Sequence, residues 1–373
     1  MQFTLSSSTL NARLQTLART LSNKNTISIL DCFLFEVANN VLTITASDSE
    51  NVMQSVVELE ECSGDGRFAI ASRTILDAVK ELAEQPLSFD VHDNLNVEIH
   101  YQNGVYRLTA QDASEYPALQ PIESGATVVT VASDMLLGCI SRSLFATSQD
   151  EIRPVMSGVY FDLTEDYMAV VATDGHKLVR SRNLTVKSNA PASFILPKKP
   201  ATLLKNVLSH NDGDVVIKFY DKGAEIRFAD GVLSCRLLEG RYPNYNSVIP
   251  ENNPNEMTID RKSLIGALKR VLPFASESSQ LVRFHISGSG LDLMSEDIDF
   301  ATSAKESILC NYDGNTMDIG FKGSAMSDIL NNLESEEVTI RLADPSRAGV
   351  ITPTTQSENE EVLMLIMPML LND

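Results

Sequence analysis

The sequence predicts an α+β protein built from three similar units, each with two helices packed on one face of antiparallel sheet. Two observations predict this class. First, a short strand followed by an amphipathic helix recurs at a spacing of about 125 residues, the size of a small domain. Second, the segments between the helices alternate apolar and polar residues and contain Asn-Gly, Lys-Gly and Asp-Gly pairs, as β-hairpins do. The three copies account for the whole chain.

The first strand and helix of each unit are the clearest copies. They read FTLSSSTLNARLQTLARTL from Phe3, VTVASDMLLGCISRSLFATS from Val129 and MTIDRKSLIGALKRVLPFAS from Met257. The spacing of apolar residues in the first copy predicts one buried helical stripe, made of Leu10, Leu14, Leu17 and Leu21. Short polar side chains at the start of a helix can accept backbone N–H groups, and the predicted N-caps are Ser8, Ser133 and Asp260.

A second strand and helix follow in each unit, starting at Arg67, Ser193 and Met317. Two segments without helical or strand periodicity, EYPALQPIESG (Glu115–Gly125) and RYPNYNSVIPENNP (Arg241–Pro254), are predicted linkers. We therefore expect three domains, at residues 1–122, 123–252 and 253–373.

Composition favours an ordinary globular protein of the cytoplasm. The 373 residues are 43% hydrophobic and 21% charged, and the longest apolar run, Val362 to Leu371, is far too short to cross a membrane. No basic stretch followed by an apolar core opens the chain, so we expect no signal peptide. Five scattered cysteines without a C-x-x-C pair predict reduced thiols and no zinc site.

The net charge of −20 argues against binding DNA on the outer surface, because duplex DNA repels an acidic protein. The charges are unevenly distributed, however. Residues 2–30 contain three basic residues and no acid, whereas residues 25–66 contain eight acids and no base. This pattern is compatible with ordinary surface variation, or with one basic face on an otherwise acidic protein.

The stretch VVATDGHKL (Val170–Leu178) places Asp174 and His176 two residues apart and could indicate catalysis, a metal site or a turn. A hydrolase with a Ser-His-Asp triad needs a nucleophile, and no G-x-S-x-G motif is present. The other histidines lack metal-ligand spacing, and no phosphate-binding glycine motif follows a strand, so we expect no metal and no cofactor. In the repeat, Asp174 aligns with Asp48 and Glu296, which predicts a recurring polar turn.

Several motifs together resemble one known family. TDGHKL in the middle unit, EGRYPNY at its end and IMPM near the C-terminus are similar to the bacterial sliding clamp, the β subunit of DNA polymerase III, and the resemblance covers the whole chain. It implies three clamp domains per chain and a head-to-tail homodimer that forms a ring around duplex DNA, with helices lining the hole. It also implies a non-catalytic processivity subunit that tethers the replicative polymerase. The alternatives are a hydrolase using Asp174 and His176, and a repeat scaffold without a DNA role.

The resemblance implies sequence-independent contacts to the DNA phosphates inside the ring. The matching residues are Lys24, Arg73, Gln149, Arg153, Lys198 and Lys199.

The resemblance also implies an apolar cleft between the second and third domains, where polymerase, clamp loader and repair polymerases insert a peptide of the form Gln-Leu-x-Leu-Phe. Methionine and leucine suit such an adaptable pocket. The matching residues are Met156, Thr173, Gly175, His176, Lys177, Leu178, Pro243, Val248, Leu365, Ile366, Met367, Pro368 and Met369.

For closure of the ring, the family pairs an edge strand of the first domain with the partner's third domain. The matching residues are Tyr106, Leu108, Pro273 and Phe274. This chain also departs from the family: Leu370 replaces a basic residue, Asn372 and Asp373 are additional, and Ser247, Ser279 and Ala325 stand where the family has an arginine, a phenylalanine and a tyrosine. We expect the peptide preference of the cleft to differ accordingly.

Overall fold

The computed structural model describes residues 1–22, 25, 27–117, 125–150 and 152–371. Two helices occur in each third of the chain, as the sequence predicts. They are α1 (Ser7–Ala18), α2 (Ser72–Val79), α3 (Ser133–Ser143), α4 (Lys198–Leu208), α5 (Arg261–Val271) and α6 (Gly323–Asn331). The chain forms two compact units, Met1–Leu137 with Lys199–Leu237, and Gly138–Lys198 with Leu238–Asp373. The predicted middle domain thus contributes to both units.

The first unit contains two sheets in which neighbouring strands are antiparallel. The five-stranded sheet has the order β5 (Glu61–Ser63), β1 (Gln2–Ser6), β7 (Pro86–Val91), β8 (Asn96–Tyr101) and β9 (Gly104–Thr109). The eight-stranded sheet has the order β10 (Thr127–Ala132), β15 (Asp214–Phe219), β16 (Gly223–Phe228), β17 (Gly231–Arg236), β4 (Asn51–Glu58), β3 (Val41–Ser47), β2 (Cys32–Ala38) and β6 (Gly66–Ala71).

The second unit also contains two antiparallel sheets. The nine-stranded sheet has the order β14 (Ala192–Pro197), β11 (Gly158–Leu163), β12 (Met168–Thr173), β13 (Lys177–Asn183), β26 (Glu360–Ile366), β25 (Gly349–Pro353), β24 (Glu337–Leu342), β18 (Asn255–Asp260) and β22 (Asn311–Tyr312). The four-stranded sheet has the order β21 (Thr302–Ile308), β20 (Gly290–Asp297), β19 (Leu281–Ser287) and β23 (Met317–Lys322).

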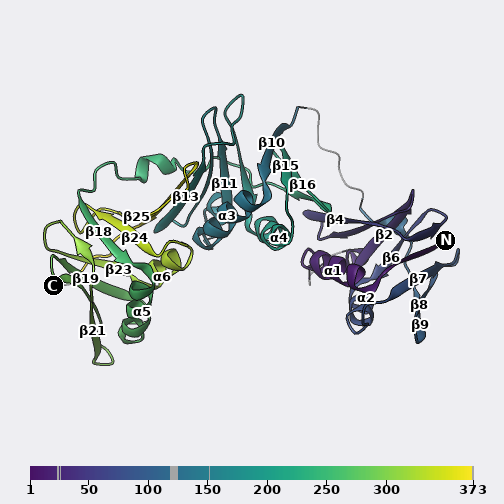
Figure 1. Ribbon diagram of the computed structural model, residues 1–373, viewed down its shortest axis with the longest axis horizontal. Coiled ribbons are helices and arrows are strands. Elements are labelled where there is room, and N and C mark those ends of the chain that lie inside the picture. Colours follow the sequence, from purple (N-terminus) through teal and green to yellow (C-terminus); the bar gives the residue numbers. More distant parts are fainter. Residues whose placement is uncertain (23–24, 26, 118–124, 151, 372–373) are drawn as a thin grey trace. The chain divides into compact units, whose positions relative to one another are not determined.

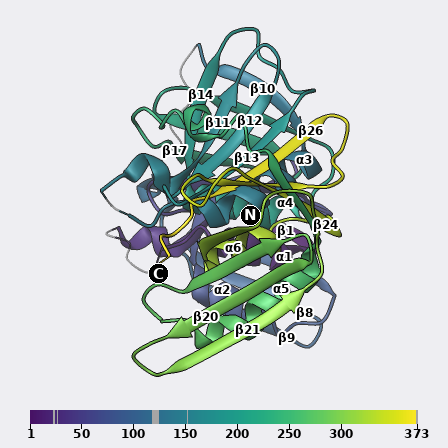
Figure 2. The same cartoon turned by 90° about the vertical axis from the view of Figure 1, so that its left-hand side faces the viewer.

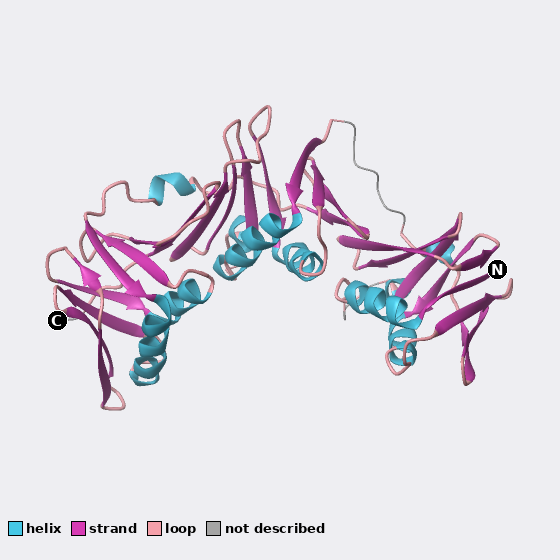
Figure 3. Cartoon of the chain, viewed as in Figure 1, coloured by secondary structure: helices cyan, strands magenta, loops and turns pink. Residues whose placement is uncertain are grey.

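Within each unit the helices gather on one face of the sheets, and α1 lies beside α2 as α5 lies beside α6 (Figures 1 and 3). The buried stripe of α1 explains this packing, because Leu10, Leu14 and Leu17 are fully buried. Leu21 was wrongly placed on this stripe, since α1 ends at Ala18.

The predicted N-caps are partly wrong. The side chain of Ser6, and not Ser8, accepts the Thr9 N–H and caps α1. Ser133 is the first residue of α3, and its hydroxyl donates to the Asn211 carbonyl at 2.8 Å. Asp260 caps α5 by accepting the Ser263 N–H, as predicted. Because three consecutive serines, Ser6 to Ser8, occur where α1 begins, the sequence alone could not distinguish the cap.

Two strand pairs join neighbouring thirds of the chain into continuous sheets. In the first unit β17, from the middle third, pairs with β4, from the first third. In the second unit β26, the last strand of the chain, pairs with β13, from the middle third. Both pairs join the last strand of one third to the strand that follows the polar turn of the preceding third.

We predict that Gly231→Ala destabilises the protein by about 1–3 kcal/mol through the pairing of β17 with β4. A Cβ on Gly231 would lie 2.1 Å from the Gln54 carbonyl oxygen, so the two strands must separate to admit it. The matched control is Gly288→Ala, where no atom lies within 4 Å of the added Cβ. Calorimetric unfolding measures both variants, and equal stability of the two would contradict a close approach of the strands.

Candidate functional site

The turn between β12 and β13 is held by Asp174. One carboxylate oxygen accepts the backbone N–H groups of His176 and Lys177, each at 2.9 Å, and the other lies 2.6 Å from the Lys177 ammonium. Thr173 donates to the Lys177 carbonyl at 2.7 Å, and Gly175 supplies the positive φ of 90° that the turn requires. The carboxylate is therefore directed at its own turn and does not orient the His176 ring as a catalytic dyad would.

A turn held by an aspartate occurs in each third of the described chain, although its register differs in the last third. Asp48 accepts the N–H groups of Glu50 and Asn51 at 3.0 and 2.7 Å. In the last third Asp297 accepts those of Asp299 and Phe300 at 3.0 and 3.2 Å. A recurring polar turn is thus confirmed, but the acid that holds it in the last third is Asp297 and not the predicted Glu296. Asp297 stands at the paired position of Ser47 and Thr173, and the positive φ of this turn falls at Ala301, whereas it falls at Ser49 and Gly175 in the other two. We call these three the aspartate turns.

The first two aspartate turns also bind a lysine. Burial alone would raise the pKa of Asp174, but the bond from Lys177 and the backbone N–H groups outweigh it and hold the pKa below the ordinary value. Asp48 shows the same balance, because Lys199 and Asn51 lower its pKa against the effect of burial. The Lys199 ammonium lies 2.5 Å from Asp48 and 2.7 Å from the Thr20 carbonyl oxygen.

Most residues of the predicted cleft lie together. Leu178 is paired with Leu365 across β13 and β26, and the Met367 N–H donates to the His176 carbonyl at 2.8 Å. Leu178, Leu365 and Ile366 are buried, whereas Met367 is 40% exposed. The second aspartate turn (Thr173–Lys177) and the chain end (Leu365–Met369) therefore form one surface region, which we call the turn–tail surface.

The segment Arg241–Pro254, predicted to be a linker, is partly core. Tyr242 and Tyr245 are buried in one cluster with Leu178 and Leu365, and the Tyr242 ring stacks on Tyr160 at 4.5 Å. Tyr245 donates to Asp162 at 2.7 Å. This packing fixes the exposed residues Pro243 and Val248 of the predicted cleft beside buried neighbours.

Beyond Pro368 the chain continues along β23. The Met369 N–H donates to the Gly320 carbonyl at 2.8 Å, and the two residues form an isolated bridge. Leu370 is 87% exposed. β26 ends at Ile366, two residues before Pro368, which has no N–H to donate to a strand ladder.

Arg153 lies at the turn–tail surface and not on a helix. It precedes the short 3-10 helix η4 (Pro154–Ser157), and its guanidinium Nη1 lies 3.4 Å from the position of a Cβ on Gly175. The Met156 Cε lies 3.8 Å from the same position, and Asp150 forms an ion pair with Arg153 at 3.5 Å. The resemblance implies only a contact with DNA for Arg153. No motif or spacing in the sequence indicates that it lies beside the turn at Gly175.

The other predicted DNA contacts are scattered over different elements. Arg73 on α2 is 95% exposed and lies 3.9 Å from Asp77, whereas Lys198 begins α4 and Gln149 lies in an exposed loop. Lys199 already binds Asp48, so its charge is used within the first unit. Lys24 lies outside the described residues.

The predicted interface residues lie at sheet edges or near them. Tyr106 and Leu108 are half-buried on β9, which has β8 as its one neighbouring strand among the described residues. Pro273 and Phe274 belong to the 3-10 helix η6 (Leu272–Phe274), and Phe274 is 40% exposed.

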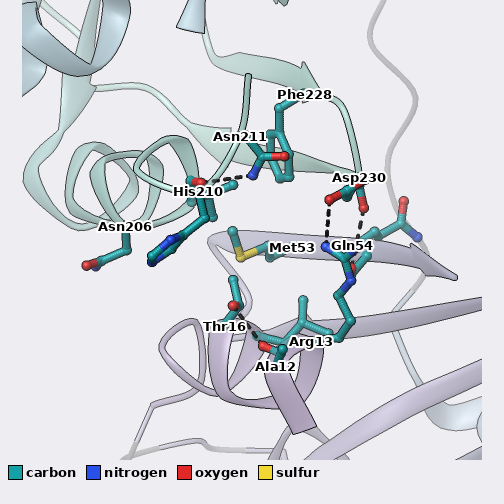
Figure 4. A pocket seen from close by; sticks show the side chains of 13 residues that line it. Ala12, Arg13, Thr16, Met53, Gln54, Asn206, His210, Asn211, Phe228 and Asp230 are labelled. Carbon is teal, nitrogen blue, oxygen red and sulfur yellow. Dashed lines mark hydrogen bonds and ion pairs between the residues drawn. The ribbon is translucent and has the colours of Figure 1, made fainter. Parts of the chain in front are cut away.

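A cavity of about 160 Å³ lies between α1, β4 and the end of α4 in the first unit (Figure 4). Leu17, Met53 and Val207 contribute buried apolar side chains, and His210 lies at its rim. Arg13 on α1 binds Asp230 at 2.8 Å across this cavity. The ion pair joins residues 217 positions apart, and the sequence carried no signal for it.

No helix among the described residues is long and apolar enough to cross a membrane. The same part of the chain contains no group of three His, Cys, Asp or Glu side chains placed to hold a metal ion.

Comparison with known proteins agrees with the fold and the repeat. Models of the DNA polymerase III beta subunit match in sequence order: the N-terminal domain at residues 1–120, the central domain at 130–244 and the C-terminal domain at 246–370. The β sliding clamp of Chlamydia muridarum is 27% identical over the full length of both chains, and that of Bacillus subtilis is 24% identical over 99% of each.

Solved structures are similar over the whole chain. The DNA polymerase III β subunit of Thermotoga maritima has a TM-score of 0.90 at 26% identity, and both chains are fully covered. A Pseudomonas aeruginosa DnaN sliding clamp bound to griselimycin has a TM-score of 0.94 at 23% identity, again with full coverage.

Three consecutive matching domains define the class as the DNA sliding clamps, which are processivity factors and not enzymes. The chain belongs to the DNA polymerase III beta subunit family. This membership removes the hydrolase and the DNA-free scaffold as alternatives.

We predict that Asp174→Asn lowers the free energy of unfolding by about 1.5–3 kcal/mol at neutral pH, because a charged hydrogen bond to Lys177 is lost. The pKa of Asp174 is lowered in the folded state, so its contribution is present above the unfolded pKa and is lost as pH falls through the folded value. The difference between the proteins should be constant from about pH 8 to 5 and shrink below about pH 4.

Thermal unfolding across this pH range tests the prediction. Asp166→Asn is the control, since Asp166 is an exposed carboxylate at another turn and should change stability by less than about 0.5 kcal/mol. A difference that persists unchanged at low pH would show that the ion pair is not its source.

Proposed function

We propose that this protein is a DNA sliding clamp that works as a head-to-tail homodimeric ring around duplex DNA. It tethers the replicative polymerase, and the clamp loader and repair polymerases bind the same peptide site. Family membership supports the class, and one feature of the strand order supports the ring. Among the described residues, one strand of each kind that forms a recurring strand pair has no such partner.

The recurring pair follows the aspartate turns. The strand after the first turn, β4, pairs with the last strand of the middle third, β17. The strand after the second turn, β13, pairs with the last strand of the final third, β26. Among the described residues the strand after the third turn, β21, pairs with β20 alone, and the last strand of the first third, β9, pairs with β8 alone. Pairing of β21 with β9 of a second copy repeats the junction and closes a ring.

DNA is held in this proposal by enclosure and by weak phosphate contacts without sequence preference. Arg73, Lys198 and Gln149 are the proposed contacts, together with Lys24, whereas Lys199 serves mainly to bind Asp48. A net charge of −20 is compatible with this arrangement, because enclosure does not require tight binding.

The turn–tail surface is the proposed peptide site. Met367 is exposed, and its N–H donates to the His176 carbonyl of the turn that Asp174 holds. The exposed Val248 belongs to the 3-10 helix η5 (Tyr245–Val248), whose Tyr245 packs with Leu178. Arg153 adds a positive charge beside Gly175, so we assign it to this surface in preference to DNA. Where the resemblance gives the family an arginine, a phenylalanine and a tyrosine, this chain has Ser247, Ser279 and Ala325, and its peptide preference differs accordingly in this proposal.

We propose three clamp domains at residues 1–122, 123–252 and 253–373, and a location in the cytoplasm. All five cysteines are thiols and not disulfides, which supports a reducing environment. Burial raises the pKa of Cys139 to about 11 and that of Cys235 to about 12, which keeps both thiols protonated and unreactive.

The ring is tested by retention on DNA. Loaded protein should remain on nicked circular DNA and slide off after the same DNA is cut once, because enclosure and not affinity holds it. Retention is measured by gel filtration of the protein–DNA mixture, and size exclusion of the free protein should give twice the chain mass. Equal retention on circular and linear DNA would overturn the proposal.

The peptide site is tested with Met367→Ala combined with Met369→Ala. The double variant should lose binding of a Gln-Leu-x-Leu-Phe peptide, because the apolar contacts of the turn–tail surface are removed, and it should remain dimeric. Isothermal calorimetry measures the affinity. Val128→Ala, at a residue 56% exposed on β10, is the control and should bind as the wild type does. Unchanged affinity in the double variant would place the peptide elsewhere.

A further inference from the structure

The third aspartate turn exposes large apolar side chains beside an open strand edge. Ile298 is 84% exposed and Phe300 is 80% exposed, and both lie between β20 and β21 (Figure 2). Phe274 of η6 is 40% exposed, and η6 contacts both strands of this hairpin. Exposed apolar residues next to an unpaired edge strand are a hazard for a monomer and typical of an interface.

The strand registers show which residue of the third turn corresponds to the residues of the first two turns that contact β17 and β26. Ser47 pairs with Val52, Thr173 with Leu178 and Asp297 with Thr302 across the three turns. Glu50, His176 and Phe300 each lie two residues before the second member of these pairs, so Phe300 holds the same position in the strand register.

In the β4–β17 and β13–β26 pairs, the residue at this position binds the end of the strand that comes from the following third of the chain. The Glu50 carbonyl accepts the Arg236 N–H at 3.1 Å, and the His176 carbonyl accepts the Met367 N–H at 2.8 Å. Arg236 is the final residue of β17, and Met367 directly follows β26. The same geometry between copies places Phe300 against the end of the partner's β9, where Leu108 lies.

The charged residues of the two open strands are already paired inside their own units. On β21, Lys305 binds Asp292 at 2.8 Å and Glu306 binds Arg270 at 2.8 Å. On β9, Arg107 binds Glu98 at 2.8 Å. Near the turn, the acids Glu296 and Asp299 remain exposed. The edges therefore offer apolar side chains and backbone groups, and few charges that are free to form ion pairs between subunits.

The turn also holds its apolar residues in place before any partner arrives. Asp297 accepts the Phe300 N–H at 3.2 Å, and Ala301 has a positive φ of 51° with its N–H donating to the Ile298 carbonyl at 3.3 Å. A preformed turn loses little conformational entropy on association, which favours tight closure.

We infer that Ile298 and Phe300 form an apolar latch that closes the ring on β9 of a second copy, and that closure depends little on salt. This inference rests on the proposed dimer and specifies the chemistry of its interface. Ion pairs between exposed charges weaken as salt increases, whereas apolar contacts do not. The dissociation constant of the wild-type dimer should therefore change less than about threefold between low and high salt.

The experiment compares wild type with Ile298→Ser combined with Phe300→Ser by analytical ultracentrifugation at 50 and 500 mM NaCl. Loss of two exposed anchors should raise the dissociation constant by roughly ten- to a hundredfold at both salt concentrations. Leu370→Ser, at a residue 87% exposed in the same unit, is the control and should dimerise normally. Unfolding of each variant by calorimetry should match the wild type, because the altered side chains are exposed.

Two results would overturn the latch while leaving the clamp intact. One is normal dimerisation of the double variant, and the other is a wild-type dissociation constant that rises more than about tenfold with salt, which indicates closure by ion pairs. A wild-type protein that stays monomeric and is not retained on circular DNA would instead overturn both the latch and the ring.

Discussion

Antiparallel pairing between consecutive thirds of the chain is the interaction on which the rest of this structure depends. Seven residues of β13, from Lys177 to Asn183, pair with β26 from Ile366 back to Glu360. An exposed strand of this length would be prone to aggregation if left alone. Pairing turns each exposed edge into the interior of a sheet, so each third is complete only in the presence of its neighbour.

The aspartate turns support this pairing by binding the residue at which the added strand ends. In the first turn Asp48 binds two backbone N–H groups and Lys199, which comes from the middle third. In the second turn Asp174 binds its own neighbour Lys177. Each turn then presents a carbonyl group to the end of the added strand, at Glu50 and at His176. This hydrogen bond therefore helps to set the register in which β17 pairs with β4 and β26 pairs with β13.

The sequence predicted whatever is local or repeated. The number of helices, the strand–turn repeat and the turn role of Asp174 all follow from periodicity and short-range polar chemistry. It failed where two local solutions compete, as with Ser6 and Ser8 at α1, or where the register of the repeat changes, as at Asp297. Both errors concern which of several neighbouring residues makes the hydrogen bond, and this is settled only when the chain is folded.

Contacts between distant segments could not be predicted from the sequence at all. Lys199 and Asp48 are 151 residues apart and Arg13 and Asp230 are 217 apart, and neither pair is marked by a motif. Arg153 resembles a surface base in the sequence, yet it packs beside Gly175. Only the family resemblance predicts that the turn at Thr173 and the tail at Met367 lie together, because members of one family share the same long-range strand pairing.

The turn and strand edge that recur in each third of the chain thus differ in the side chains around them. In the first, the Lys199 ammonium binds both Asp48 and the Thr20 carbonyl oxygen. In the second the carbonyl of His176 meets Met367, and a proline directly after it directs the chain out of the sheet, which exposes an apolar side chain beside a rigid turn. The third carries Ile298 and Phe300 next to an edge without an added strand among the described residues. The same strand pairing therefore serves three purposes. With Lys199 it joins two thirds of the chain, with the Met-Pro-Met tail it exposes an apolar surface, and with Ile298 and Phe300 it leaves an edge to which a second copy can bind.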